Sequence, residues 1–118
     1  MKVITTTKNI ELTPALKNFV EKKFSALKKF IGKILVEVFV ELEKETQHHK
    51  KGKIFLVKTQ LSLPGRILTV WSREDDLFKA IVAAKDEMKL EIEKYKFRTI
   101  DKRRRQQRKI KREYVNFN

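Results

Sequence analysis

The period of the apolar residues changes near Lys33, and this change constrains the fold more than any other feature of the sequence. Before it, between residues 16 and 31, apolar side chains recur at steps of three and four, which is the spacing of one face of an α-helix. After it, from Ile34 to Leu42, every second residue is apolar, as in a strand with one buried face. Because 118 residues leave little room for a second domain, we expect helix and strand to form one compact unit.

Capping and turn residues set the limits of the other predicted elements. Thr13-Pro14 offers a helix N-cap followed by proline at the first helical position, and Gly32 is a natural helix stop. Leu63-Pro64-Gly65-Arg66 has Pro and Gly where a type II turn between two strands needs them. Ser72, with three acidic residues close behind it, is the expected cap of the last helix. The predicted elements are strands over residues 2–7, 34–43, 54–63 and 67–71, a helix over 14–31 and a helix from 72 to about 98.

This order, β-α-β-β-β-α, predicts an α+β fold in which a four-stranded sheet carries two helices packed on one face. The stripe of the last helix that is expected to face the core consists of Leu77, Ile81, Ala84, Met88, Ile92 and Tyr95. Trp71 and Tyr95 fall in core-like patterns, so we expect both to pack rather than to stack on a ligand. We interpret the glutamates of the second strand as a solvated outward face that discourages aggregation through the sheet edge; they are Glu37, Glu41, Glu43 and Glu45.

Positive charge is concentrated at the C-terminal end of the chain. There are 29 Lys and Arg against 15 Asp and Glu, a formal net charge of +14, and residues 94–118 alone hold 11 basic and 2 acidic side chains. We therefore divide the chain into two parts, a folded α+β domain over residues 1–98 and a basic tail over residues 99–118. Like charges repel, so the run over residues 102–112 is not expected to fold without a polyanion, and continuation of the last helix into the tail is expected only in a bound state.

A nucleic acid is the polyanion that this charge pattern favours. Arginine presents a planar fork that matches phosphate, and residues 102–109 contain none of the apolar side chains that a membrane-surface helix requires. Lys85, Lys89 and Lys96 share one helical stripe, about a quarter-turn from the core stripe. A tail that only aids solubility is the alternative. The candidate RNA-binding residues are Lys22, Lys23, Lys28, Lys29, Lys85, Lys89, Lys94, Lys96, Arg98, Lys102, Arg103, Arg104, Arg105, Arg108 and Lys109.

Two aromatic residues lie beyond the basic run, where no core is available to them. Tyr114 and Phe117 are therefore candidates for stacking on bases or for docking, and a disordered chain end is the alternative interpretation.

The sequence lacks the residues that most catalytic and cofactor sites require. It has no cysteine, which excludes disulfides, thiolate metal sites and a cysteine nucleophile, and its three glycines cannot form a glycine-rich phosphate loop. His48 and His49 adjoin in a predicted loop without a third ligand, while helix capping explains Asp75 and Asp76. We expect no catalytic residue, metal, cofactor or small-molecule substrate. With no apolar run near the ~20 residues of a membrane span and no signal peptide, a cytoplasmic protein without membrane contact is expected.

Two segments, each containing a predicted helix start, resemble a known family. The first is Thr7-Lys8-Asn9-Ile10-Glu11-Leu12-Thr13-Pro14-Ala15-Leu16, which continues through residues 19–24 and 27–30. The second is Glu74-Asp75-Asp76-Leu77-Phe78-Lys79-Ala80-Ile81, whose helix ends in Lys94-Tyr95-Lys96. Over roughly residues 2–98 the chain is similar to the short ribosome hibernation-promoting factors, which include the ribosomal subunit interface protein and are also described as sigma-54 modulation proteins. The family has the same β-α-β-β-β-α order.

The resemblance implies a protein that binds the small ribosomal subunit near the decoding region, in the channel used by messenger RNA and by tRNA anticodon ends. Such a protein blocks initiation and protects idle ribosomes, with no chemistry of its own. The family's helix cations that are matched here, position by position, are Lys23, Lys29, Lys94 and Lys96.

Several other basic positions of the family are changed in this chain. The residues found there are Ala26 in the first helix and Glu87, Leu90 and Glu93 in the second. Our hypothesis is that Lys85 and Lys89, together with the arginine-rich tail, supply replacement contacts to RNA.

The long members of the family add a C-terminal domain that pairs two ribosomes, and the resemblance implies that a chain ending at Asn118 lacks this domain. Two other functions stay open at this point. One is a constitutive ribosomal protein whose basic tail threads through RNA, and the other is a general binder of structured RNA.

Overall fold

The computed structural model describes the backbone of residues 1–45 and 54–116, and the side chains of residues 1–45, 54–98 and 104–105. Within this part the elements are β1 (Lys2–Lys8), α1 (Pro14–Ser25), α2 (Lys28–Ile31), β2 (Glu37–Lys44), β3 (Phe55–Leu63), β4 (Arg66–Glu74) and α3 (Leu77–Asn116). The predicted α+β fold with the order β-α-β-β-β-α is confirmed, and the first predicted helix is divided into α1 and α2.

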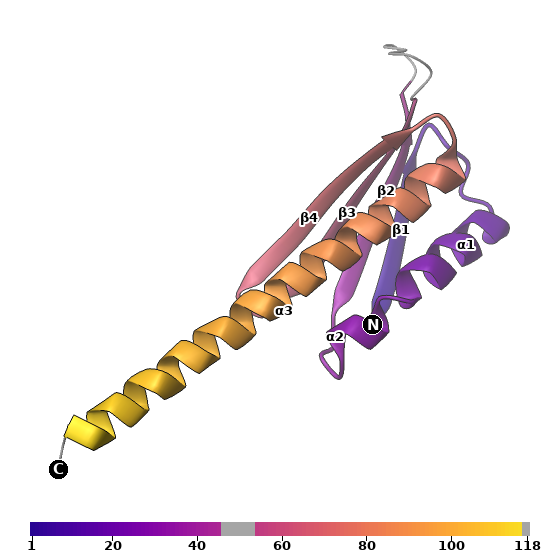
Figure 1. Ribbon diagram of the computed structural model, residues 1–118. Coiled ribbons are helices and arrows are strands. Elements are labelled where there is room, and N and C mark those ends of the chain that lie inside the picture. The colour runs from indigo at the N-terminus through magenta and orange to yellow at the C-terminus, as the bar shows by residue number, and fades with distance from the viewer. Residues whose placement is uncertain (46–53, 117–118) are drawn as a thin grey trace.

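The described strands form one sheet in the order β1-β2-β3-β4. Strand β1 runs parallel to β2, and the β2–β3 and β3–β4 pairs are antiparallel. The helices lie together on one side of this sheet (Figure 1), as the sequence predicted. Between β3 and β4, Gly65 has a φ of +78°, the left-handed value that the third position of a type II turn requires.

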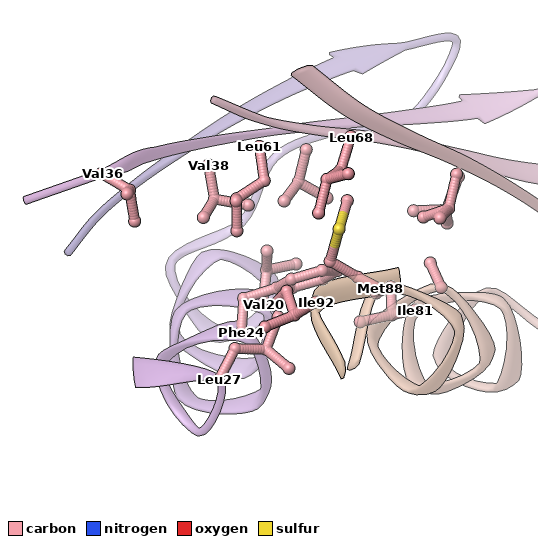
Figure 2. Packing of buried hydrophobic residues seen from close by; sticks show 14 of the residues in the cluster. Val20, Phe24, Leu27, Val36, Val38, Leu61, Leu68, Ile81, Met88 and Ile92 are labelled. Atoms are coloured by element: carbon pink, nitrogen blue, oxygen red, sulfur yellow. The ribbon is translucent and has the colours of Figure 1, made fainter. Parts of the chain in front are cut away.

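The core lies between the sheet and the helices. Figure 2 shows Val38, Leu61 and Leu68 of the sheet pointing toward Phe24 of α1 and Met88 of α3. All five of these side chains are buried, and the expected core stripe of α3 faces them. At the end of that stripe, the Tyr95 hydroxyl donates a hydrogen bond of 2.9 Å to the Pro64 carbonyl oxygen, so Tyr95 packs as predicted and joins α3 to the β3–β4 turn.

The predictions for Ser72 and Trp71 are wrong, because β4 continues to Glu74. Ser72 is buried within the strand, opposite Val57, and does not cap a helix. Instead Asp76 caps α3, since its Oδ1 accepts hydrogen bonds from the backbone N–H groups of Phe78 at 2.8 Å and Lys79 at 3.1 Å. Trp71, one position before Ser72, faces the opposite side of the sheet and is 54% exposed.

Strand β2 begins later than its alternating pattern predicts. The first pair with β1 joins Lys2 to Glu37, so residues before Glu37 would have to pair beyond the start of β1. Ile34 and Leu35 consequently lie outside the strand and are 43% and 92% exposed, although the pattern places Ile34 on the buried face. From Val38 to Leu42 the alternation is confirmed, with the glutamates on the outward side.

The first helix is interrupted at Ala26 and Leu27, where neither glycine nor proline marks a break. Leu27 and Ile31 are both buried, so the interruption keeps the apolar stripe directed at the core. The predicted stop at Gly32 is confirmed, since Gly32 has positive φ and its N–H donates to the Lys28 carbonyl oxygen at 3.1 Å.

Helix α3 is longer than the sequence predicted, because its backbone continues past Arg98 to Asn116. This segment contains neither glycine nor proline and is rich in Lys, Arg and Gln, which are good helix formers. It crosses the predicted boundary at residue 98 without a break and extends beyond the end of the sheet (Figure 1).

The hydroxyl of Thr59 is fully buried on β3 and has no hydrogen-bond partner among the described residues. Thr59→Val removes this polar group while keeping the shape of the side chain, so we expect stability to rise by about 1 kcal/mol and the melting temperature by roughly 4 °C. Thr69→Val, at an exposed position of β4, is the matched control and should change stability by less than about 0.5 kcal/mol. Thermal unfolding followed by circular dichroism measures both. A lower melting temperature for Thr59→Val would show that its hydroxyl is satisfied.

Candidate nucleic-acid interface

The helices form a surface rich in lysine, which we call the helical face: the side of α1, α2 and α3 turned away from the sheet. Lys22, Lys28 and Lys29 are exposed on α1 and α2, and Lys23 is half-buried. On α3, Lys94, Lys96 and Arg98 are exposed, while Lys85 and Lys89 are half-buried. Because all helices lie on one side of the sheet, these candidate RNA-binding residues belong to one layer of the molecule (Figure 1).

Two lysines from different helices converge on the ring of Phe30. The Lys29 Nζ lies 5.1 Å from the ring centroid and the Lys89 Nζ lies 4.9 Å from it. The two ammonium groups are therefore no more than about 10 Å apart, and the ring electrons offset part of their mutual repulsion. Phe30 itself is partly buried against the core. This arrangement, which we call the Phe30 lysine pair, holds two positive charges near each other on the helical face.

A second aromatic contact lies near the start of α3. The Lys23 Nζ is 5.5 Å from the ring centroid of Phe19, and Phe19 meets Phe78 edge-on at a centroid distance of 4.8 Å. The Phe19–Phe78 contact joins α1 to α3, so the position of Lys23 is tied to the packing of the helices. Sequence reasoning found the lysines but missed Phe19 and Phe30 as their supports. The four-residue step from Phe19 to Lys23 was a readable signal, whereas the Lys89–Phe30 contact depends on tertiary packing.

Ion pairs distinguish lysines that the sequence analysis grouped together as candidate RNA contacts. The Lys85 Nζ lies 2.6 Å from the Asp86 Oδ1, and the Lys94 Nζ lies 3.2 Å from the Glu91 Oε1. Both lysines therefore already have an anionic partner. Lys89, in contrast, has an aromatic ring beside its ammonium group and no ion pair within the described part of the chain. Of the two proposed replacement contacts on α3, the geometry favours Lys89.

Residues 99–116 of the basic tail form the last part of α3. The side chains of Arg104 and Arg105 are exposed. For the other predicted tail contacts, the structure describes only the helical backbone, at Lys102, Arg103, Arg108 and Lys109. Tyr114 lies on the same helical backbone, whereas Phe117, His48 and His49 lie outside the described residues.

Among the residues whose side chains are described, no group of three or more His, Cys, Asp or Glu could hold a metal ion. None of the helices in the described part is both long enough and apolar enough to pass through a membrane.

The fold and the helical face together define a basic α+β domain with helices on one side of a mixed sheet and the other side open. The chain belongs to the family described as Sigma 54 modulation protein / S30EA ribosomal protein, which matches residues 3–100. This finding confirms the resemblance that the two helix starts suggested.

Two curated relatives are similar over 97 residues, 81% of this chain. The ribosome hibernation promoting factor of Klebsiella oxytoca is 29% identical, with 94% of its length covered. The ribosome hibernation promotion factor of Deinococcus radiodurans is 26% identical, and this chain spans about half of it, 49%.

Two solved structures share the fold. The crystal structure of the Thermus thermophilus protein Y N-terminal domain has a TM-score of 0.68 at 24% identity, covering 80% of this chain and 99% of that one. A ribosomal subunit interface protein from Coxiella burnetii has a TM-score of 0.67 at 22% identity, covering 81% of this chain and 98% of that one. The four-stranded sheet with its helices is thus the fold of these proteins.

Lys89→Gln and Lys85→Gln make the same charge change on one helix, four residues apart. We expect Lys89→Gln to weaken binding to ribosomes and to lower the slope of log affinity against log salt by about 0.7–0.9, the share of one phosphate. Lys85→Gln should leave the slope nearly unchanged, because Asp86 already pairs with Lys85. Filter binding at four or more salt concentrations measures both slopes. Equal losses for the two variants would contradict the distinction.

Proposed function

We propose that this protein is a ribosome hibernation factor: it binds the small ribosomal subunit near the decoding region, in the channel used by messenger RNA and tRNA, and thereby inhibits translation and protects idle ribosomes. The Phe30 lysine pair carries this proposal, because it fixes two cations from separate helices on one surface. Membership of the Sigma 54 modulation protein / S30EA ribosomal protein family supports it, as do the printed names of the two relatives.

The helical face suits folded RNA better than a flat anionic surface. The helices α1, α2 and α3 lie on one side of the sheet, so their exposed lysines can meet several phosphates of one RNA structure at once. A lysine held beside an aromatic ring loses less conformational freedom on binding than a lysine that moves freely. RNA contacts by Lys23 and by the Phe30 lysine pair are therefore favoured.

The tail extends the basic surface beyond the folded domain. Residues 99–116 continue α3 by about 27 Å at 1.5 Å per residue. Arginine and lysine make up eight of these positions, so the extended helix carries a dense row of cations away from the domain. We propose that the tail follows RNA beyond the footprint of the domain and compensates for Glu87, Leu90 and Glu93.

The experiment that tests this function combines binding, mapping and activity on purified ribosomes. We expect the protein to co-sediment with small subunits, to protect nucleotides of the decoding region from chemical probing and to inhibit cell-free translation. Binding should weaken steeply with salt, because each neutralised phosphate adds about 0.7–0.9 to the log–log slope. Continued peptide synthesis at saturating occupancy, or protections only outside the decoding region, would overturn the proposal.

Deletion of residues 101–118 tests the contribution of the tail. The core contacts of α3 extend to Tyr95, so the shortened protein should fold and melt close to the full chain. We expect its affinity for small subunits to fall by more than that of Lys17→Glu, a charge reversal at an exposed position of α1. Co-sedimentation at several protein concentrations gives both affinities. Equal binding by the truncated and full-length proteins would show that the tail is dispensable.

A further inference from the structure

The sheet has a second surface, on the side away from the helices, that the proposed RNA contacts do not use. We call it the open face (Figure 1). It carries large exposed apolar side chains: Phe39 is 43% exposed, Trp71 is 54% exposed and Ile67 is 65% exposed. Aromatic residues gathered on an exposed surface are typical of protein interfaces, because they bury much area with little loss of conformational freedom.

The charges of the open face differ from those of the helical face. Glu43 pairs with Lys8 at 3.6 Å, and Glu45, at the end of β2, pairs with Arg73 at 2.6 Å. Glu41 lies directly opposite Lys58 in the β2–β3 register, yet no ion pair joins them in the described part of the chain.

The Lys58 ammonium group is engaged elsewhere. Its Nζ lies 4.8 Å from the ring centroid of Trp71, its neighbour on β4. The cation expected to neutralise Glu41 is therefore held over an aromatic ring, and Glu41 has no ionic partner among the residues whose side chains are described. A shallow depression of about 210 Å³ lies beside it, lined by Ile4, Thr6, Phe39, Glu41, Lys58 and Gln60.

This combination fits a cationic side chain with an apolar stem. The stem of a lysine or arginine would pack against Phe39 and Ile4, and its charged end would reach the carboxylate of Glu41. A phosphate backbone fits less well, because it would approach the carboxylate of Glu41, whose neighbour Lys58 is held over Trp71.

We propose that the open face docks a basic protein surface, which inserts a lysine or arginine into the depression at Glu41. The inference rests on the proposed function, and on the ribosome the partner is a basic protein of the small subunit. The protein then contacts RNA with its helical face and a protein with its open face.

A photo-crosslinker tests which class of molecule meets the open face. Phe39→p-benzoylphenylalanine places it beside the depression, and Phe97→p-benzoylphenylalanine places it on the basic end of α3, where Phe97 is 74% exposed. Each variant is bound in excess to purified small subunits, so that occupancy is equal, and is then irradiated. We expect position 39 to form adducts with a small-subunit protein and position 97 to form adducts with RNA. RNA adducts at position 39, or no adducts there, would overturn the proposal.

A charge reversal makes the test specific. In the position-39 protein, Glu41→Lys should lower the yield of the protein adduct at least about tenfold, because like charges then meet at the interface. Glu41→Gln should lower the yield of the protein adduct by a smaller factor. It replaces Glu41→Lys as the test variant if Glu41→Lys lowers the melting temperature. Glu11→Lys makes the same charge change at an exposed site off the sheet and should leave the yield unchanged. A yield insensitive to both Glu41 variants would contradict the depression as the docking point.

Co-sedimentation of the same samples separates this inference from the proposed function. If the unmodified protein fails to sediment with small subunits, the proposed function fails and this inference fails with it. If the proteins sediment but the adduct at position 39 is RNA or absent, only the docking of a protein at the open face is wrong.

Discussion

One-sided burial of the sheet is the constraint on which the rest of the structure depends. Along β2, Val38, Val40 and Leu42 point into the core while the glutamates between and beside them point out. Since only one side of the sheet is apolar enough to bury, every helix packs against that side. The helices bring their lysines with them, so positive charge gathers on the helical face. The open face keeps the glutamates of β2 beside Lys58 and large apolar side chains, and the two surfaces acquire different chemistry without any boundary between domains.

Aromatic rings fix the positions of several lysines on the helical face. A lysine on an exposed helix normally samples many rotamers, but Lys29 and Lys89 both lie beside Phe30, and Lys23 lies beside Phe19. These rings are partly buried, so the packing of the core sets the positions of the charges. On the open face the same interaction has the opposite effect. There Trp71 holds Lys58, which leaves the carboxylate of Glu41 available to a partner.

The errors of sequence reasoning have identifiable physical causes. Ser72 has the composition of a helix cap, but pairing with β3 extends β4 through it, and Asp76 takes the capping role. The alternating pattern extends back to Ile34, but the partner strand β1 is short, so the pairing between β1 and β2 begins only at Glu37. Trp71 was expected in the core because it falls in a core-like pattern, although its register places it opposite Lys58 on the outward side. In each case the pairing between strands, which is a non-local contact, decided the outcome.

The sequence by itself determined the element order, the stripes that meet in the core, the Gly32 and Gly65 positions and the concentration of cations in the helices and tail. Each of these follows from local spacing or from the backbone freedom of single residues. Only the tertiary structure decided which lysines act together. Lys89 meets the ring of Phe30 because α2 packs on α3, whereas Lys85, on the same predicted stripe, meets Asp86. Contacts between residues far apart in the chain depend on packing geometry, and periodicity along one helix contains no information about the neighbouring helix.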